Sequence, residues 1–157
     1  MVWPNRGLAH RPVAMGTRGA VASAHPLASL AGMEILKSGG NAVDAAIATA
    51  AALNVAEPYM SGIGGSGYML IYAARERRLR VLDYIGPASR NASLSAFENE
   101  TAKNHGPKSP LIPSAAAGWL TAHAAYGSLP LETLFAPAIG YATAGAPLTV
   151  KTHGSMT

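Results

Sequence analysis

Residues 61–68 read SGIGGSGY, and their glycines Gly62, Gly64 and Gly67 have the Gly-x-Gly-x-x-Gly spacing of a dinucleotide-binding loop. Such a loop needs a strand before it and a helix after it, because the helix N-terminus supplies amide groups and a positive dipole to the pyrophosphate. The predicted order is the reverse, with a helix before the glycines and a strand after them. The sequence therefore predicts no cofactor. The glycines are interpreted as a tight turn that permits positive φ and exposes bare backbone to another segment or a substrate.

Other reactive side chains do not fall into catalytic patterns. Ser66 lies between two glycines, but a nucleophile elbow needs a strand-to-helix turn and a glycine where Tyr68 stands. The five histidines show neither i, i+4 pairing nor clustering with carboxylates, and there is no cysteine. We therefore expect no metal site and no cysteine nucleophile.

The charge balance does not indicate a nucleic-acid partner. Twelve Lys and Arg residues stand against eight Asp and Glu, for a net charge of +4 that is spread along the chain. One basic cluster, in ARERRLR at residues 74–80, lies between two strand-like runs and is interpreted as a solvated hairpin turn. Only 13% of residues are charged and 49% are hydrophobic, so much of the surface is expected to be covered by other protein.

No stretch has the pattern of a membrane span or a secretion signal. The most apolar run, residues 42–56, contains Asp44, Thr49 and Asn54 and is shorter than the roughly 18 residues of a span. It is interpreted as a buried helix. The first 19 residues lack the uninterrupted apolar run of about 7 to 15 residues that a secretion signal needs. No membrane partner is therefore expected, and a cytoplasmic location is favoured.

Capping residues and hydrophobic spacing predict two helices in the first third of the chain, after a short strand at residues 20–25. Pro26 suits the first turn of the first helix, and the glycines at 39–40 suit its end. Asn41 is predicted to cap the second helix, with Asp44 in its first turn, and Pro58 ends it. The predicted inner face of the second helix comprises Val43, Ala46, Ile47, Ala50 and Leu53.

Two later runs, residues 68–74 and 79–85, have strand composition and predict an antiparallel hairpin. Further helices are predicted at residues 93–100, 114–127 and 131–145. Ser114 is predicted to cap the second of these, and Pro137 is expected to strain the third. The order of elements indicates an α+β or layered α/β fold with an antiparallel sheet.

Two long strings carry a resemblance to a known family. AHPLASLAGMEILKSGGNAVDAAIATAAALNVAEPYMSGIGGSGYMLIY, ending at Tyr72, closely resembles the front of the γ-glutamyltransferase (γ-glutamyltranspeptidase, glutathione hydrolase) family. IPSAAAGWLTAHAAYGSLPLETLFAPAIGYATAGAPL resembles that family's later proline-glycine-helix segment and its LLAPAI helix. The likeness runs in register over about residues 15–150, and such a joint match is more specific than any single motif. The chain is identified as a member of this family that corresponds to the first part of the large subunit.

The resemblance implies an N-terminal nucleophile hydrolase with a layered αββα sandwich, of which only part is present. Residues 1–19 are expected to form an irregular arm, and residues 20–157 a partial large-subunit domain. Family members are made as one precursor that cuts itself into a large and a small subunit. The new N-terminal threonine of the small subunit attacks a γ-glutamyl amide, its own α-amine serving as the base. The acyl group then passes to water, an amino acid or a peptide.

This implied mechanism leaves no catalytic residue in the chain. The family's catalytic threonine follows a longer large subunit, whereas Thr157 is the last residue here. The chain alone is therefore expected to be inactive. Its expected partners are a small-molecule γ-glutamyl or acyl-amide substrate, the remainder of the large subunit, and the small subunit.

The substrate-binding positions depart from the family pattern. After the hairpin the family commonly has Arg-Glu-x-Ala-Pro, whose arginine binds the α-carboxylate of the γ-glutamyl group in a fork. Aligning LDYIGPAS with it places Ile85 at the arginine and Gly86 at the glutamate, and Arg90 could substitute only if the loop folds back. This departure predicts poor glutathione binding. The candidate site comprises Ile85, Gly86 and Arg90 with the glycine turn, Gly62, Gly64, Gly65 and Gly67.

Two alternatives stay open beside a γ-glutamyltransferase-like enzyme. The chain could be a standalone non-catalytic module that pairs with a separate small subunit or a homologue. It could also belong to a family amidohydrolase with a non-glutamyl substrate. If the chain exists alone, its uncovered strand edges and apolar face predict aggregation or oligomerisation.

Overall fold

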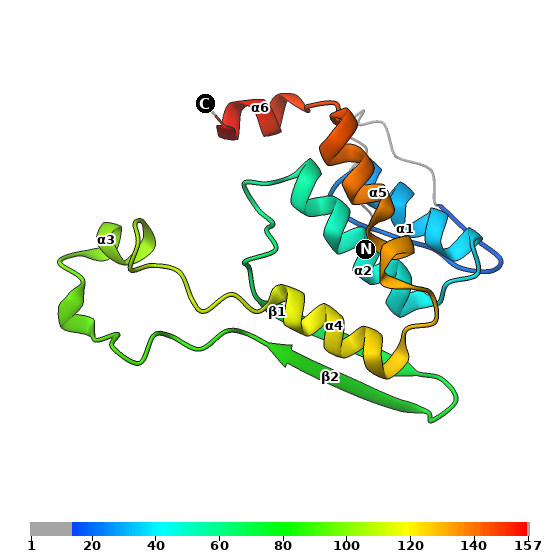
Figure 1. Ribbon diagram of the computed structural model, residues 1–157, viewed down its shortest axis with the longest axis horizontal. Helices are drawn as coiled ribbons and strands as arrows, with labels where there is room; N and C mark the ends of the chain where they lie inside the picture. The colour runs from blue at the N-terminus through cyan, green and yellow to red at the C-terminus, as the bar shows by residue number, and fades with distance from the viewer. Residues whose placement is uncertain (1–13, 157) are drawn as a thin grey trace, which may run out of the picture.

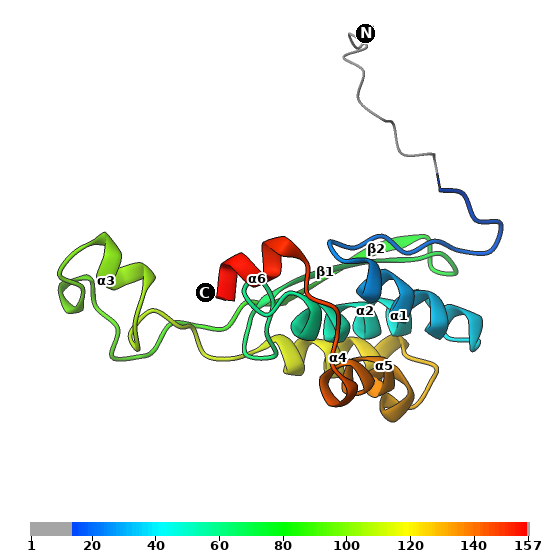
Figure 2. The ribbon, with the colours of Figure 1, turned by 90° about the horizontal axis from the view of Figure 1, so that it is seen from above.

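The computed structural model describes residues 14–156 of the chain, and its elements form a layered body with one long excursion (Figure 1). The strands are β1 (Gly67–Ala73) and β2 (Arg78–Tyr84), and a 3-10 turn, η1, spans Leu94–Ala96. The helices are α1 (Pro26–Lys37), α2 (Ala42–Ala56), α3 (Glu100–Asn104), α4 (Ala115–Tyr126), α5 (Leu131–Ala144) and α6 (Val150–Met156). Figure 2 shows the hairpin and the extended segment before α1 at one level, α1 and α2 below them, and α4 and α5 beneath.

The first helix begins and ends as predicted. The His25 ring caps α1, because its Nδ1 accepts a hydrogen bond from the Leu27 N–H at 3.2 Å. Pro26 occupies the first turn, and the chain leaves the helix through Ser38 and Gly39. Gly39 has a φ of +91°, a conformation that glycine adopts without steric cost.

The second helix is fixed by a capping box. The Asn41 side chain accepts hydrogen bonds from the Val43 and Asp44 N–H groups, while the Asp44 carboxylate accepts one from the Asn41 N–H. The predicted inner face was wrong at Ala46, which is exposed, whereas Ala45, Ala48 and Ala52 are buried. Alanine on every side of α2 gives no contrast between faces, so the neighbouring elements alone decide which alanines are covered.

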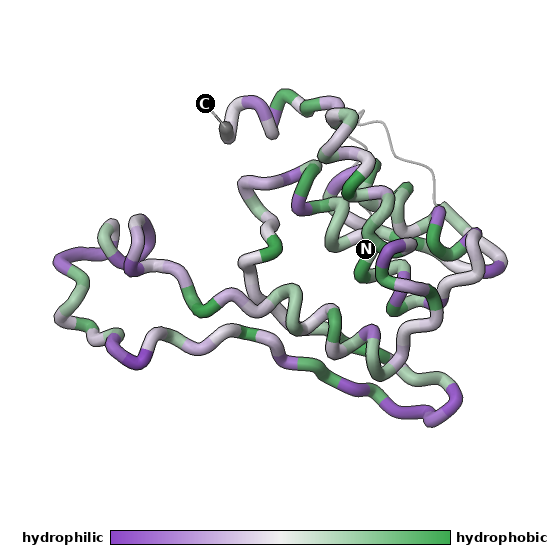
Figure 3. The backbone as a smooth tube through the Cα atoms, viewed as in Figure 1, coloured by the Kyte–Doolittle hydropathy of each residue, from purple (hydrophilic) through white to green (hydrophobic). Residues whose placement is uncertain are grey.

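The core forms where α2 meets α4, α5 and the inner face of the hairpin. Its larger buried side chains are Ile35, Ile47, Trp119 and Leu134. The inward residues of the hairpin, Met69, Ile71, Leu82 and Tyr84, pack against this cluster. Figure 3 shows the apolar residues concentrated in the body, with hydrophilic residues at the hairpin tip and around α3.

The predicted hairpin is confirmed, with each strand displaced by one residue from its expected bounds. β1 and β2 pair antiparallel, with Leu70 opposite Val81. The tip turns through Arg77, and Glu76 and Arg80 form an ion pair there. The outer face carries exposed hydrophobic side chains, namely Tyr68, Leu70, Tyr72, Leu79 and Val81.

The strand predicted at residues 20–25 does not form. Within the part of the chain that the structure describes, residues 14–24 take part in no backbone–backbone hydrogen bond. A β-strand needs a neighbouring strand with which its backbone forms hydrogen bonds, and residues 14–156 supply none for residues 20–25. Residues 14–19 of the predicted arm are exposed and irregular, and the rest of that arm lies outside the described residues.

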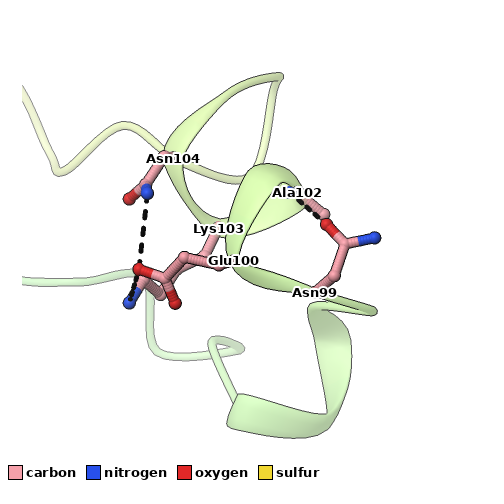
Figure 4. A network of polar contacts seen from close by, with 5 residues as sticks. All are labelled: Asn99, Glu100, Ala102, Lys103 and Asn104. Atoms are coloured by element: carbon pink, nitrogen blue, oxygen red, sulfur yellow. Dashed lines mark hydrogen bonds and ion pairs between the residues drawn. The ribbon is translucent and has the colours of Figure 1, made fainter.

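The helix predicted at residues 93–100 is divided into η1 and α3. Asn99 starts the second piece, because its side chain accepts a hydrogen bond from the Ala102 N–H at 2.9 Å and so acts as a new N-cap (Figure 4). Glu100 binds both Lys103 and Asn104 in the same short helix. α5 runs continuously through Pro137, and α6 was not predicted.

The segment of residues 87–113 leaves the body after β2 and returns before α4, carrying η1 and α3 away from the other helices (Figure 1). Its base is narrow. The Ile112 N–H donates to the Pro87 carbonyl at 3.1 Å, and a Cβ on Gly86 would lie 1.8 Å from the Ile112 carbonyl oxygen. Only glycine fits at residue 86 without movement of the backbone.

Among residues 14–156, no helix combines the length and the hydrophobicity needed to cross a bilayer.

Candidate functional site

The glycine turn connects α2 to β1 along the chain and binds the start of α4 through backbone hydrogen bonds. The Gly65 N–H donates to the Gly62 carbonyl at 2.8 Å, which closes the turn. The Gly65 carbonyl then accepts hydrogen bonds from the Ser114 and Ala115 N–H groups, at 3.1 and 2.8 Å. These two N–H groups stand at the start of α4 and have no partner within the helix, so the glycine turn caps α4.

The expected positive φ is absent from this turn. Gly62, Gly64, Gly65 and Gly67 all have negative φ, since the described glycines with positive φ are Gly39, Gly106 and Gly145. Close approach explains two of the four instead. A Cβ on Gly65 would lie 2.9 Å from the Gly62 carbonyl oxygen, and one on Gly67 would lie 3.1 Å from the Tyr84 hydroxyl. Gly62 and Gly64 face open space.

Ser114 precedes α4 as predicted, but its hydroxyl does not cap the helix. The Ser114 Oγ donates instead to the Tyr84 carbonyl at the end of β2. One residue therefore binds the glycine turn through its N–H and the hairpin through its side chain. The start of α4, the start of β1 and the end of β2 are held together at this point.

Beside this junction lies a cavity of about 170 Å³. Its walls come from the last turns of α2, the glycine turn, Tyr84 and the first turns of α4. The polar side chains that line it are Asn54, Ser61, Ser66 and Tyr84, and Trp119 supplies the largest apolar surface. No lining side chain is an acid, a lysine or an arginine. The cavity can therefore donate and accept hydrogen bonds, but it offers no counter-ion to a charged ligand.

Ile85, Gly86 and Arg90, which were predicted to bind substrate, are close in sequence, but none of them lines this cavity. The Ile85 side chain is 44% exposed and follows directly after the cavity residue Tyr84. Gly86 is buried at the base of the excursion. Arg90 is exposed on the excursion, and its side chain makes no hydrogen bond or ion pair with the described residues. The role of these three residues in substrate binding stays a prediction.

Tyr84 is the residue of this region that sequence reasoning missed. Its ring lies between β1 and α4, because Gly67 faces it across the hairpin and a Cβ on Gly118 would lie 2.2 Å from its Cγ. The signal that could have found it is a pair of glycines, one in a strand and one in a helix, that leave room for a single aromatic ring.

A second polar network lies at the other end of α2, away from the cavity. The buried Asp44 carboxylate accepts hydrogen bonds from the Ser128 N–H at 3.0 Å, from the Ser128 hydroxyl and from the Asn41 N–H. The Asn41 side chain donates to the Tyr126 carbonyl at 2.6 Å. Burial raises the pKa of Asp44, but the hydrogen bonds from Ser128, Asn41 and Leu129 outweigh it, so the pKa lies below its ordinary value of 3.8. This network ties α2 to the loop between α4 and α5.

In the region that the structure describes, no three histidine, aspartate or glutamate side chains gather closely enough to hold a metal ion.

Comparisons of the sequence with known proteins match it to one family. The sequence model of the gamma-glutamyltranspeptidase family matches residues 28–157. The acylase ACY 1 proenzyme of Pseudomonas sp. (strain SE83) is 42% identical over 148 residues, which cover 87% of this chain and 26% of the relative. The chain thus spans about a quarter of that protein's length.

Two solved structures resemble the chain closely in shape. The gamma-glutamyltranspeptidase of Helicobacter pylori aligns with a TM-score of 0.85 at 30% identity, over 92% of this chain and 43% of that one. The cephalosporin acylase of Bacillus halodurans aligns with a TM-score of 0.83 at 37% identity, over 98% of this chain and 29% of that one. The chain therefore has part of the fold that these two proteins share.

Proposed function

The chain belongs to the gamma-glutamyltranspeptidase family, a family of N-terminal nucleophile hydrolases, and on that premise we propose that it is the first portion of the large subunit of an amide-cleaving enzyme. We further propose that this enzyme acts on an acyl group other than γ-glutamyl. The nucleophile, a threonine, would come from the part of a family-length protein outside these 157 residues.

The proposed reaction needs no cofactor. The threonine hydroxyl oxygen attacks the carbonyl carbon of the amide and its proton passes to the free α-amine. The carbon–nitrogen bond breaks, and the amine leaves with that proton, so the acyl group is held as an ester. Water or an acceptor amine then attacks the ester and releases the threonine. The chain would contribute the wall of the substrate pocket, through Tyr84 and the glycine turn.

The choice of acyl group depends on the alignment of LDYIGPAS with the family pattern, in which Ile85 stands where the resemblance implies a carboxylate-binding arginine. A γ-glutamyl group has a charged α-carboxylate, and a carboxylate moved from water without a partner loses several kcal/mol of solvation. Neither Ile85 nor the uncharged lining of the nearby cavity replaces that solvation. The glutamate of the family pattern does not fit at the neighbouring Gly86 either, because a side chain there would overlap the Ile112 carbonyl.

Membership of the family is compatible with a non-glutamyl acyl group, because the relatives include an acylase at 42% identity as well as a glutathione hydrolase at 46%.

A chimera tests the proposal. Residues 28–157 would replace the matching portion of the Bacillus halodurans cephalosporin acylase, and kcat/KM would be measured with γ-glutamyl-p-nitroanilide and with the neutral pentanoyl-p-nitroanilide. We expect the pentanoyl substrate to be preferred. Ile85→Arg should raise kcat/KM for the γ-glutamyl substrate about tenfold, chiefly through KM, because a charge-assisted fork forms in a partly exposed site.

Two results would count against the proposal. An unchanged KM for the γ-glutamyl substrate in Ile85→Arg would show that residue 85 does not face the acyl group. A rise in that KM in Arg90→Ala would show that Arg90 reaches the substrate and replaces the missing arginine. In the second case the enzyme would be a γ-glutamyl enzyme after all.

A further inference from the structure

The peptide group between Tyr84 and Ile85 is bound through both its C=O and its N–H. The Ser114 hydroxyl donates to the Tyr84 carbonyl. The Ile85 N–H donates to the Asp83 Oδ1 at 2.9 Å. An aspartate that accepts from the N–H two residues further on forms an Asx turn, which bends the chain at the end of a strand. The side chains of Asp83 and Ser114 thus hold the backbone immediately before residue 85.

These contacts and those of Ile112 fix the direction in which the side chain of residue 85 leaves the backbone. A peptide group is planar and includes the next Cα, so hydrogen bonds to its C=O and N–H also place the Ile85 Cα. Beyond Ile85, a Cβ on Gly86 would lie 1.8 Å from the Ile112 carbonyl oxygen. The Ile112 N–H then donates to the Pro87 carbonyl at 3.1 Å. The backbone is therefore held on both sides of residue 85.

Ser114 is available for its contact because another group caps α4. A serine before a helix ordinarily accepts a hydrogen bond from an N–H of the first turn. Here the Gly65 carbonyl binds the N–H groups at the start of α4, and the Ser114 hydroxyl makes no capping bond. Ser114→Ala would therefore keep the backbone contact with Gly65 and remove only the contacts of the hydroxyl.

We propose that Asp83 and Ser114 are positioning residues, which orient the side chain of residue 85 toward the acyl group and so determine how strongly that residue selects the substrate. Neither side chain needs to touch the substrate itself. The role rests on the proposed function, because it requires residue 85 to face the acyl group. Arg90 is not held in this way, since it lies beyond Pro87 on the exposed excursion.

A double-mutant cycle in the chimera with the Bacillus halodurans acylase tests the role of Ser114. It compares the chimera with Ile85→Arg, Ser114→Ala and the double variant on γ-glutamyl-p-nitroanilide. Ile85→Arg alone should lower KM about tenfold, but only about threefold or less beside Ser114→Ala, because a charge-assisted fork depends on direction. With pentanoyl-p-nitroanilide, kcat should stay within about twofold in all of these proteins, because a neutral acyl group does not use the fork.

Two substitutions of Asp83 separate the Asx turn from the charge of the carboxylate. Asp83→Asn keeps an oxygen that can accept from the Ile85 N–H, whereas Asp83→Ala has none. The KM gain from Ile85→Arg should persist at about tenfold beside Asp83→Asn and fall to about threefold or less beside Asp83→Ala. Equal gains beside the two substitutions would overturn the positioning role, since the charge and not the turn would then act on the substrate.

Amide hydrogen exchange in the chimera checks the turn without any substrate. The Ile85 amide should exchange about fivefold faster in Asp83→Ala, because its acceptor is lost, and at the original rate in Asp83→Asn. An Ile85 amide that exchanges equally in Asp83→Ala and in the chimera would contradict the turn, and with it the role of Asp83.

Ser38→Ala is the matched control for Ser114→Ala. The Ser38 hydroxyl also donates to a backbone carbonyl, that of Glu34 at 2.9 Å, in a contact confined to the end of α1. The gain from Ile85→Arg should stay at about tenfold beside this variant. A gain reduced equally by Ser38→Ala and Ser114→Ala would show a general loss of stability and overturn the positioning role.

The kinetics distinguish failure of this role from failure of the proposed function. If Ile85→Arg alone gives no gain in KM, residue 85 does not face the acyl group, and both proposals fail. If Ile85→Arg gives the full gain beside Ser114→Ala and beside Asp83→Ala, the proposed function stands and the positioning role is overturned.

Discussion

Asp44 links two parts of the chain that are 84 residues apart in sequence. Its carboxylate accepts hydrogen bonds from both the N–H and the hydroxyl of Ser128, and it closes the capping box of α2 as well. A charge-assisted hydrogen bond contributes more than a neutral one, and a buried acceptor that loses its charge leaves its donors poorly paired. We therefore expect Asp44 to be among the side chains on which stability depends.

Asp44→Asn should lower the free energy of unfolding at pH 7 by about 2 to 3 kcal/mol, the range for hydrogen bonds to a buried charge. The folded-state pKa lies below 3.8, so the ionised group stabilises the fold above that pH, and the contribution is lost as pH falls through the folded pKa. The difference between wild type and variant should therefore shrink below about pH 4. Urea unfolding at pH 7 and at pH 3 measures both effects.

Glu76→Gln is the matched control for Asp44→Asn. It removes a carboxylate from an exposed ion pair with Arg80 at the hairpin tip. Exposed pairs contribute about 1 kcal/mol or less, so this variant should unfold much like wild type. An equal effect of the two variants would contradict the role given to Asp44.

The contact of Asp44 with Asn41 could be predicted from sequence, whereas its contact with Ser128 could not. The capping box joins Asn41 and Asp44 over three residues, so local pattern was enough to place it. Ser128 lies in a loop between two later helices, and no local pattern connects it with α2. Contacts between distant segments depend on packing, which periodicity does not specify.

At the scale of elements, the contact between α4 and the hairpin depends on a helical glycine. A Cβ on Gly118 would lie 2.2 Å from Tyr84 Cγ, whereas a Cβ on Gly140 in α5 would meet nothing within 4 Å. Glycine in a helix interior is less favourable than alanine by about 1 kcal/mol. The same substitution should therefore have opposite effects at the two sites.

Gly118→Ala should lower the free energy of unfolding by about 1 to 3 kcal/mol, because the hairpin must move away from α4. Gly140→Ala should raise it by about 0.5 to 1 kcal/mol. Thermal unfolding of both variants against wild type provides the measurement. If both variants gained stability, the close approach of Tyr84 to α4 would be contradicted.

The elements that could be predicted from sequence are those whose signals are local. α1, α2, α4, α5 and the hairpin have caps, glycine ends or a turn within the segment itself. The strand at residues 20–25 was predicted from composition, but a strand needs a hydrogen-bonded neighbour that residues 14–156 do not supply. Asn99 likewise divided a predicted helix, because a capping residue inside a helical pattern can start a new helix.

The candidate site was predictable only in part. The glycine turn was correctly expected to approach other segments, but its partner, the start of α4, lies 49 residues away from Gly65. Tyr84 was missed because its position depends on two glycines in different elements. Ile85, Gly86 and Arg90 came from the family pattern, and their role awaits the chimera experiment.

At the scale of the whole molecule, the outer face of the hairpin is apolar and uncovered. Leu70 is 66% exposed and its cross-strand partner Val81 is 61% exposed, with Tyr68, Tyr72 and Leu79 on the same face. An apolar face of a free two-stranded sheet is a surface for association. We expect the isolated 157-residue chain to self-associate through this face.

The double variant Leu70→Lys/Val81→Glu should shift the isolated chain from oligomers toward monomer in sedimentation velocity, because it places an opposite-charge pair on that face. The control Leu94→Lys/Val150→Glu changes two exposed hydrophobic residues outside the hairpin and should leave the oligomers unchanged. A monomeric wild-type chain with cooperative thermal unfolding would contradict this prediction and favour a standalone module.

The narrow base of the excursion allows residues 87–113 to change in length with little effect on the rest of the protein. Pro87 and Ile112 are joined by a hydrogen bond, and Gly86 permits their close contact, so the two ends of the segment are fixed together by the body itself. For a closed loop, each doubling of length costs only about 0.6 kcal/mol. Insertions, deletions or a fused domain between these ends would alter what the protein presents to its surroundings while α2, the hairpin and α4 keep their packing.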